Sequence, residues 1–217
     1  MAKTQAPLFG FRARGQLGKT LVFSDWRGVS YARQRVIPAN PSTEAQVSVR
    51  SVFAWLNDYW RLASSLAHEP WEAYARGRPF TGRNALISFN VPQLRDATDL
   101  FQFVASPGTM SAPPLSDLVA SSGPESGEIV ATASVGSLAP GWSVVQVVFV
   151  CLRNQDPHSA FLETVRVASV EEEPYEVTFD SLSPGEGYVV TAWGVFRRPD
   201  GRLAYGPSVL TYQVAGS

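Results

Sequence analysis

The stretch that most resembles a chemical motif is residues 13–20, ARGQLGKT. It matches a relaxed phosphate-binding loop in which Ala13 replaces the first glycine. Such a loop needs a buried strand before it and a helix after it, because the N–H groups at the helix N-terminus face the phosphates. The residues that follow, TLVFSDW, have the pattern of a strand instead. We therefore expect no nucleotide site here.

The histidines and the single cysteine do not form a catalytic or metal-binding group in the sequence. His68 and His158 each lie beside turn residues, so both are expected at the surface. Cys151 lies in the apolar run VVFVCL, where a small buried side chain is its usual role. No zinc spacing, serine-hydrolase elbow or calcium loop is present. The sequence thus predicts a protein without catalytic residues, cofactor or metal, and not an enzyme.

Basic and aromatic side chains alternate near the N-terminus. This pattern suits single-stranded nucleic acid, on which bases stack, and it also suits protein interfaces, where arginine pairs with carboxylates. The protein interface is favoured, because the basic density is modest for a nucleic-acid binder. The expected interface residues are Trp26, Arg27, Tyr31, Arg33 and Arg35.

Charge is distributed unevenly along the 217 residues. Residues 1–100 contain 13 Lys or Arg against 7 Asp or Glu, and residues 101–217 contain 5 against 12, so the halves carry +6 and −7. This favours two domains with different neighbours, although small domains also vary this much by chance. The run at residues 171–173, EEE, is most simply a solvated loop that a basic partner could use.

The N-terminus, MAKTQAPLFG, lacks the apolar segment of a secretion signal, and no run reaches the roughly 18 apolar residues of a membrane helix. We expect a soluble protein made in a cytoplasm.

A hairpin followed by a long helix is predicted for the first half. KTLVFSDW and VSYARQRV flank Arg27-Gly28, which could form the hairpin loop. Thr43 and Gln46 then form a capping box for an amphipathic helix over residues 44–67, which Pro70 ends. WEAYARG is expected as a further helical turn closed by Gly77. The long helix has more apolar residues than one hairpin can cover, so either a strand near NALISFNV or another chain must cover it.

The second half is predicted to be all-β. Residues 105–115, ASPGTMSAPPL, have the composition of a linker. Beyond them, strand-like runs repeat about every ten residues between Gly and Pro turns, which indicates an antiparallel sandwich. The expected division is an α+β domain of hairpin and helix at residues 1–104, a linker at 105–114 and an immunoglobulin-like or fibronectin III-like sandwich at 115–217.

One spacing resembles fibronectin type III domains. LSPGEGY, residues 182–188, places Tyr188 where the tyrosine of the E–F corner bonds back to the backbone. The second strand, EIVATASV, lacks the tryptophan usual in such domains. Trp142 and Trp193 are expected to fill the core instead.

The N-terminal pattern resembles a family of poorly characterised proteins of tailed bacteriophages and prophages. The resemblance covers about residues 10–92, from GQLGKTLVFSDWRGVSYARQRVIPANPSTEAQVSVRSVF through WEAYA to GRNALISFN. It implies a non-enzymatic virion structural protein, anchored on a symmetric lattice by its N-terminal half, with the sandwich carried outward. Its implied partners are major capsid or tail proteins and further copies of itself. The alternatives are a tail, baseplate or connector component whose sandwich touches cell-surface glycan, and a bacterial adhesin or accessory module.

Overall fold

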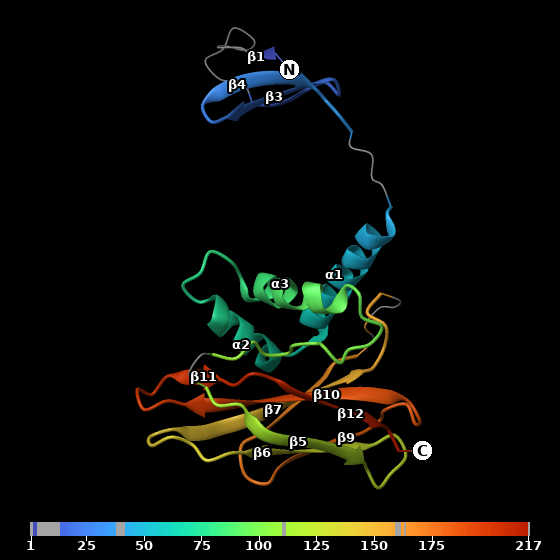
Figure 1. The fold of residues 1–217 in the computed structure, drawn as a ribbon, viewed down its shortest axis with the longest axis vertical. Helices are drawn as coiled ribbons and strands as arrows, with labels where there is room; N and C mark the ends of the chain where they lie inside the picture. Colours follow the sequence, from blue (N-terminus) through green and yellow to red (C-terminus); the bar gives the residue numbers. More distant parts are fainter. Residues whose placement is uncertain are drawn as a thin grey trace. The chain divides into compact units, whose positions relative to one another are not determined.

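The computed structural model describes residues 2–3, 14–37, 42–109, 112–158, 162 and 164–216. The chain forms two compact units, Met1–Ser42 (unit 1) and Thr43–Ser217 (unit 2). Figure 1 shows a small sheet in unit 1, and a layer of helices above a β-sandwich in unit 2. The predicted fold class, an N-terminal hairpin-and-helix region followed by an all-β sandwich, is confirmed.

Unit 1 is a four-stranded antiparallel sheet in the order β1-β4-β3-β2. Its strands are β1 (Ala2–Lys3), β2 (Gly15–Leu17), β3 (Leu21–Trp26) and β4 (Val29–Gln34). Between β3 and β4, Arg27 and Gly28 have φ angles of 49° and 78°. A two-residue type I′ loop requires positive φ at both positions, so the predicted hairpin is confirmed. Phe23 is the one buried side chain among those described in unit 1.

Three helices open unit 2: α1 (Glu44–Leu62), α2 (Ser65–Ala75) and α3 (Gly82–Leu94). Thr43 is the N-cap of α1, as predicted. The predicted capping box is not formed, because the Thr43 side chain makes no capping hydrogen bond. The Gln46 N–H donates instead to the backbone oxygen of Thr43, at 3.0 Å.

The prediction that one helix runs to residue 67 and stops at Pro70 is wrong. The chain leaves the helical conformation at Ala63 (ψ 147°), and Ser64 becomes the N-cap of α2. Pro70 then lies inside α2. The break turns the chain so that Ala67 and Trp71 enter the core, which outweighs the hydrogen bond lost at the proline. Gly77, with φ 77°, follows the end of α2 as expected.

The segment NALISFNV is helical, so the expected strand is also wrong. It lies in α3, whose N-cap Thr81 accepts a hydrogen bond from the Asn84 N–H at 3.3 Å. The buried residues Ala85, Leu86, Asn90 and Leu94 recur at helical spacing on one face. Helix α3 therefore covers part of the apolar surface of α1.

Two antiparallel sheets form the sandwich. The smaller has the order β5-β6-β9, and the larger has the order β11-β10-β7-β8 with β12 also paired to β10. Their strands are β5 (Leu115–Ser122), β6 (Ile129–Val135), β9 (Tyr175–Phe179), β7 (Ser143–Arg153), β8 (Arg166–Val170), β10 (Gly187–Arg197), β11 (Leu203–Tyr205) and β12 (Val209–Val214). A three-stranded sheet packed on a sheet built around two long central strands is the immunoglobulin-like and fibronectin III-like arrangement.

Both faces of the larger sheet are buried. Phe149 and Val190 point between the sheets, whereas Val150 and Trp193 point to the other face and share a core with Trp71 of α2. Strands covered on both sides read as continuous apolar runs, which explains the sequence WSVVQVVFVCL. Trp193 is thus buried against the helices and not between the sheets as expected, and Trp142 is half-buried beside Phe196.

The structure places the domain division elsewhere than residues 105–114. Ala105 and Ser106 are buried. The Trp71 indole N–H donates to Ala105 O at 2.8 Å, and the Ser106 hydroxyl donates to Gly206 O at 2.7 Å. Residues 105 and 106 are therefore held between the helices and the sandwich. In the described part of this stretch, the proline-rich composition that suggested a linker reflects irregular backbone packed against the sheet.

The tyrosine corner is present. The Ser183 N–H donates to the Tyr188 hydroxyl at 2.9 Å, and Tyr188 is buried. This contact closes the turn before β10, as the spacing predicted.

We expect residues 43–217 to fold alone, and a fragment of residues 112–217 to be much less stable. Removing the helices would expose Val150, Trp193 and their neighbours to water, and burial of each large apolar side chain contributes about 1.5–3 kcal/mol. Denaturant unfolding of the two fragments measures the difference. A shorter fragment as stable as the longer one would contradict the shared core.

Replacement of Tyr188 by Phe should lower the unfolding free energy of residues 43–217 by about 1 kcal/mol, because the Ser183 N–H loses its acceptor. The measurement is the urea concentration at the midpoint of unfolding, with the dependence of the unfolding free energy on urea unchanged between the proteins. Tyr212→Phe is the control, because Tyr212 is 44% exposed. If the urea midpoint of Tyr188→Phe equals that of the wild type, the corner contact does not contribute to stability.

Candidate interaction surface

One face of the unit 1 sheet carries most of the expected interface residues. The register pairs Trp26 with Val29, Ser24 with Tyr31 and Val22 with Arg33, and paired residues share a face. Trp26 is 66% exposed and Val29 is 47% exposed. Arg33 is exposed and Tyr31 is half-buried. We call these four residues the aromatic face.

The hairpin tip joins an aromatic ring to a cation. The Arg27 guanidinium lies over the Trp26 ring, 4.8 Å from its centroid. On the opposite face, Arg14 pairs with Asp25 at 3.0 Å, and Ser30 donates to the same carboxylate at 2.6 Å. Asp25 is the single acidic residue in residues 1–42 of the sequence. The hairpin tip therefore combines an exposed apolar ring with a positive charge.

Arg35 lies beyond the aromatic face. Its N–H donates to Thr20 O at 2.7 Å, which continues the pairing of the hairpin by one residue, and its side chain is exposed. Val36 and Ile37 follow, 72% and 75% exposed. Val36 and Ile37 were not predicted from the sequence as interface residues. The signal that could have identified them is a pair of adjacent apolar residues between an arginine and a proline.

The division into units sharpens the charge asymmetry. Residues 1–42 contain seven Lys or Arg and one Asp, a net charge of +6. Residues 43–100 contain six of each sign. All the positive excess of the first hundred residues thus belongs to unit 1, and unit 2 carries −7. Such a field favours an acidic partner for unit 1.

A second cluster, in unit 2, combines Ser48, His158 and Asp156. Ser48 Oγ lies 3.0 Å from His158 Nε2, and His158 Nδ1 lies 2.8 Å from Asp156 Oδ1. Ser48 and His158 line a groove of about 660 Å³ between α1 and residues 95–98. Sequence reasoning missed this cluster because 110 residues separate Ser48 from His158.

The contacts of this cluster oppose nucleophilic catalysis. His158 Nε2 also lies 2.9 Å from the backbone oxygen of Arg95, to which the Ser48 hydroxyl donates. Because the Ser48 hydroxyl already donates to that carbonyl oxygen, its proton is not directed at the imidazole, as a general base would require. The arrangement instead ties α1 to two loops. His158 is a structural link, half-buried and not simply a surface side chain.

The remaining singled-out residues have structural surroundings. His68 is half-buried, stacks on Trp60 with ring centroids 4.0 Å apart and contacts Trp60 O through Nε2 at 2.8 Å. Cys151 is buried in β7, and burial raises the pKa of its thiol to about 12. A thiol held protonated in this way is a poor nucleophile at neutral pH.

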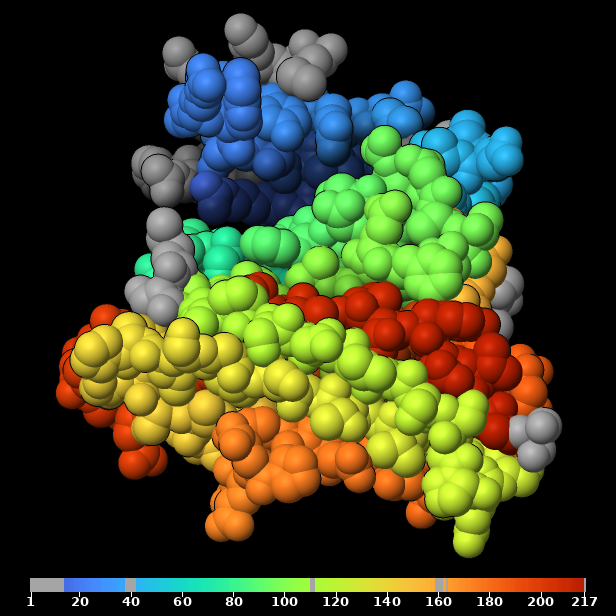
Figure 2. Space-filling model, turned by 60° about the horizontal axis from the view of Figure 1, so that its bottom comes forward, coloured from blue at the N-terminus to red at the C-terminus, as the bar shows by residue number. Residues whose placement is uncertain are grey.

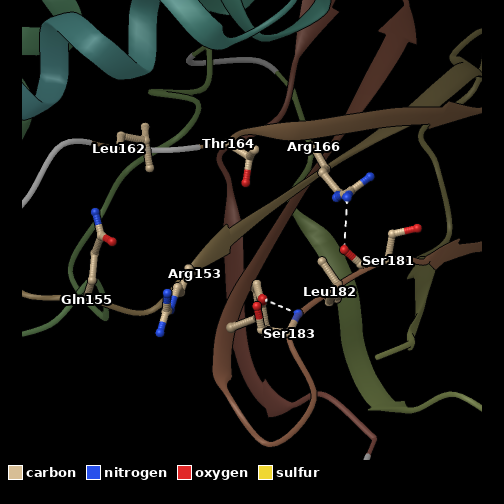
Figure 3. A pocket seen from close by; sticks show the side chains of 9 residues that line it. Arg153, Gln155, Leu162, Thr164, Arg166, Ser181, Leu182 and Ser183 are labelled. Carbon is tan, nitrogen blue, oxygen red and sulfur yellow. Dashed lines mark hydrogen bonds between the residues drawn. The ribbon is translucent and has the colours of Figure 1, made fainter. Parts of the chain in front are cut away.

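A small polar pocket lies beside Arg153 at the end of β7 and Arg166 at the start of β8 (Figure 3). It encloses about 120 Å³. Two of its side chains are arginines: Arg153 pairs with Glu186 at 2.7 Å, and Arg166 donates to Ser181 O at 3.1 Å. Arg166 also lies 3.8 Å from the Asp180 carboxylate. Because each arginine has a carboxylate partner, the pocket has little positive charge left for an anionic ligand.

Across the described residues, no three His, Cys, Asp or Glu side chains gather as a metal site would require. Nor does any helix in that part of the chain have the length and apolar character to cross a membrane.

Residues 13–105 match the family described as "Family of unknown function (DUF6266)". The match spans β2 to β4 and the three helices and stops before the sandwich. No curated protein matches the chain.

Solved structures similar to the chain include fibronectin type III domains. The FN3 domain of human collagen XX is 18% identical, with 50% of this chain and 98% of that one covered and a TM-score of 0.34. The fn3 domain of human contactin 1 is 13% identical, with coverages of 52% and 82% and a TM-score of 0.35. The FN5 domain of Drosophila Lar is 12% identical, with coverages of 47% and 96% and a TM-score of 0.32.

Proposed function

We propose that this protein is a non-enzymatic structural component of a bacteriophage particle, made in the host cytoplasm and incorporated into the virion. Unit 1 attaches it to other virion proteins, and unit 2 is the outward rigid body. The simplest such role is decoration of the capsid, in repeated copies on a symmetric lattice. The observation that carries this proposal is the aromatic face on a sheet of net charge +6.

The physical argument begins with the size of unit 1. A sheet that buries one aromatic side chain among its described residues gains little from its own core. Burial against a partner supplies the missing apolar contact. Tryptophan, tyrosine and arginine dominate the binding energy of protein interfaces, and three of the four residues of the aromatic face are of these types.

An alternative placement is the tail, baseplate or connector, where the sandwich would contact the cell surface or its glycans. The same attachment surface serves either placement. The number of copies per particle distinguishes them: hundreds indicate a capsid lattice, whereas a few or a few tens indicate the tail or connector.

Truncation of Trp26 or Arg33 to alanine should weaken attachment to particles by about 2 kcal/mol or more, roughly thirtyfold in affinity. Each change removes a large exposed side chain from the aromatic face. Co-sedimentation of purified protein with particles that lack it measures the affinity.

Leu17→Ala is the matched control. Leu17 is 52% exposed, lies in the same unit and pairs with Leu21, on the face opposite Trp26. It should leave attachment unchanged, and circular dichroism should show that all three variants fold. Residues 43–217 alone should not attach. If they attach as well as the full chain, the orientation of the molecule is the reverse of the proposal. If the aromatic face binds single-stranded DNA and no virion protein, the protein-partner assignment fails.

A further inference from the structure

The negative charge of unit 2 is concentrated beside one edge strand. In the order β5-β6-β9, strand β9 is at the border of its sheet. Residues 171–173 are three glutamates before β9, Glu176 lies on it and Asp180 follows it, and all five side chains are exposed. The sequence has no Lys or Arg between Arg166 and Arg197. We call residues 171–180 the acidic edge.

A hollow lined by both apolar and polar residues adjoins the acidic edge. It is an open depression of about 560 Å³ lined by residues 132–135 of β6 and residues 173–175. Val135 and Pro174 supply apolar surface, and Glu173 supplies a carboxylate. Burial, followed by the charge of Glu173, raises the pKa of the Tyr175 phenol. Figure 2 shows β5, β6 and the orange residues near 175 side by side on this face.

The tip of the unit 1 hairpin has the complementary chemistry. A hollow with apolar surface from Val135 and Pro174 and a carboxylate at Glu173 suits an aromatic ring with a guanidinium stacked on it, because the ring leaves water while the cation meets the carboxylate. Trp26 is 66% exposed and has Arg27 over its face. The charges also match, since unit 1 carries +6 and the acidic edge contains five carboxylates.

We propose that the Trp26–Arg27 tip of one copy docks into the hollow beside the acidic edge of a second copy. This rests on the proposed function, in which unit 1 is the attachment surface, and it adds a second copy of the chain to the partners of that surface. The two surfaces differ, so the contact is heterologous: every copy uses its tip on one neighbour and offers its hollow to another. Copies then assemble head to tail into rings or filaments, and salt weakens the association.

The test is sedimentation velocity of the full chain over a range of concentration and salt. The wild-type chain should form species larger than a dimer, which dissociate as salt rises. Trp26→Ala, which loses the tip, and a Glu172→Lys/Glu173→Lys double variant, which loses the acidic rim, should each associate about thirtyfold more weakly. All these side chains are exposed, so circular dichroism should show folded proteins.

Mixing the two variants gives the sharper result. The Trp26→Ala copy keeps an intact hollow, and the double variant keeps an intact tip, so together they should form a one-to-one dimer that grows no further. A two-fold symmetric contact, with the same patch on both copies, would not give this complementation. Arg27→Glu combined with Glu173→Arg in one chain should restore self-association.

The controls are Leu17→Ala for the tip and Glu125→Lys for the acidic edge. Glu125 is exposed on the loop between β5 and β6, outside the residues that line the hollow. Both controls should associate as the wild type does.

The proposal is overturned if the wild-type chain stays monomeric at every concentration. This includes the case in which the tip docks into the hollow of its own copy. Association that Glu172→Lys/Glu173→Lys leaves intact, or that requires added single-stranded DNA, also overturns the proposal. A monomeric chain whose particle attachment still depends on Trp26 refutes the head-to-tail contact and leaves the proposed function standing. A chain that self-associates but never attaches to particles refutes the proposed function and leaves the head-to-tail contact standing.

Discussion

The burial of both faces of the larger sheet is the constraint on which unit 2 depends. One face of β7 and β10 packs against the smaller sheet, and the other packs against α1, α2 and α3. An ordinary sandwich needs only the first of these contacts. Here the outer face contains Trp193 and Val150, which would be exposed without the helices. The helical layer, the buried segment at residues 105–106 and the sandwich therefore form one core, and the loss of any one weakens the other two.

Unit 1 has the opposite physical character. Its sheet has a well-formed type I′ hairpin and regular antiparallel register, yet it contains almost no apolar interior among the described residues. Hydrogen bonds between strands are worth little net free energy when the alternative is hydration, so such a sheet is stabilised chiefly by what covers it. In the proposed arrangement, its positive charge and exposed ring bind a partner, and the acidic edge of a second copy is one such partner.

Local signals in the sequence predicted much of the structure. Gly28 after Arg27 predicted the hairpin, Thr43 predicted the start of α1, and the spacing from Leu182 to Tyr188 predicted the corner contact. Each of these depends on a few neighbouring residues with definite backbone requirements. The register of β3 and β4 puts Trp26, Tyr31 and Arg33 on one face, and that they form an interface stays a prediction.

Features set by distant residues could not be predicted in this way. The helical conformation around Pro70 and at NALISFNV depends on which side chains can be buried in the core. The pattern of either segment alone fits more than one structure. The position of Trp193 could not be predicted for the same reason. Alternation along β10 predicts that Trp193 and Val190 lie on opposite faces of the sheet, but it does not predict that helices cover the face of Trp193. Ser48 and His158 meet only in the folded chain.

The shared core also bears on how such a chain could exchange modules during evolution. Residues 13–105 match a family on their own, and that segment includes α1 to α3, whose buried face is completed here by β7 and β10. A recombination event that replaced the sandwich with a standard one, polar on its outer face, would leave Trp55 and Trp71 against hydrophilic side chains. Inheritance should therefore keep the helices together with a sheet whose outer face is apolar.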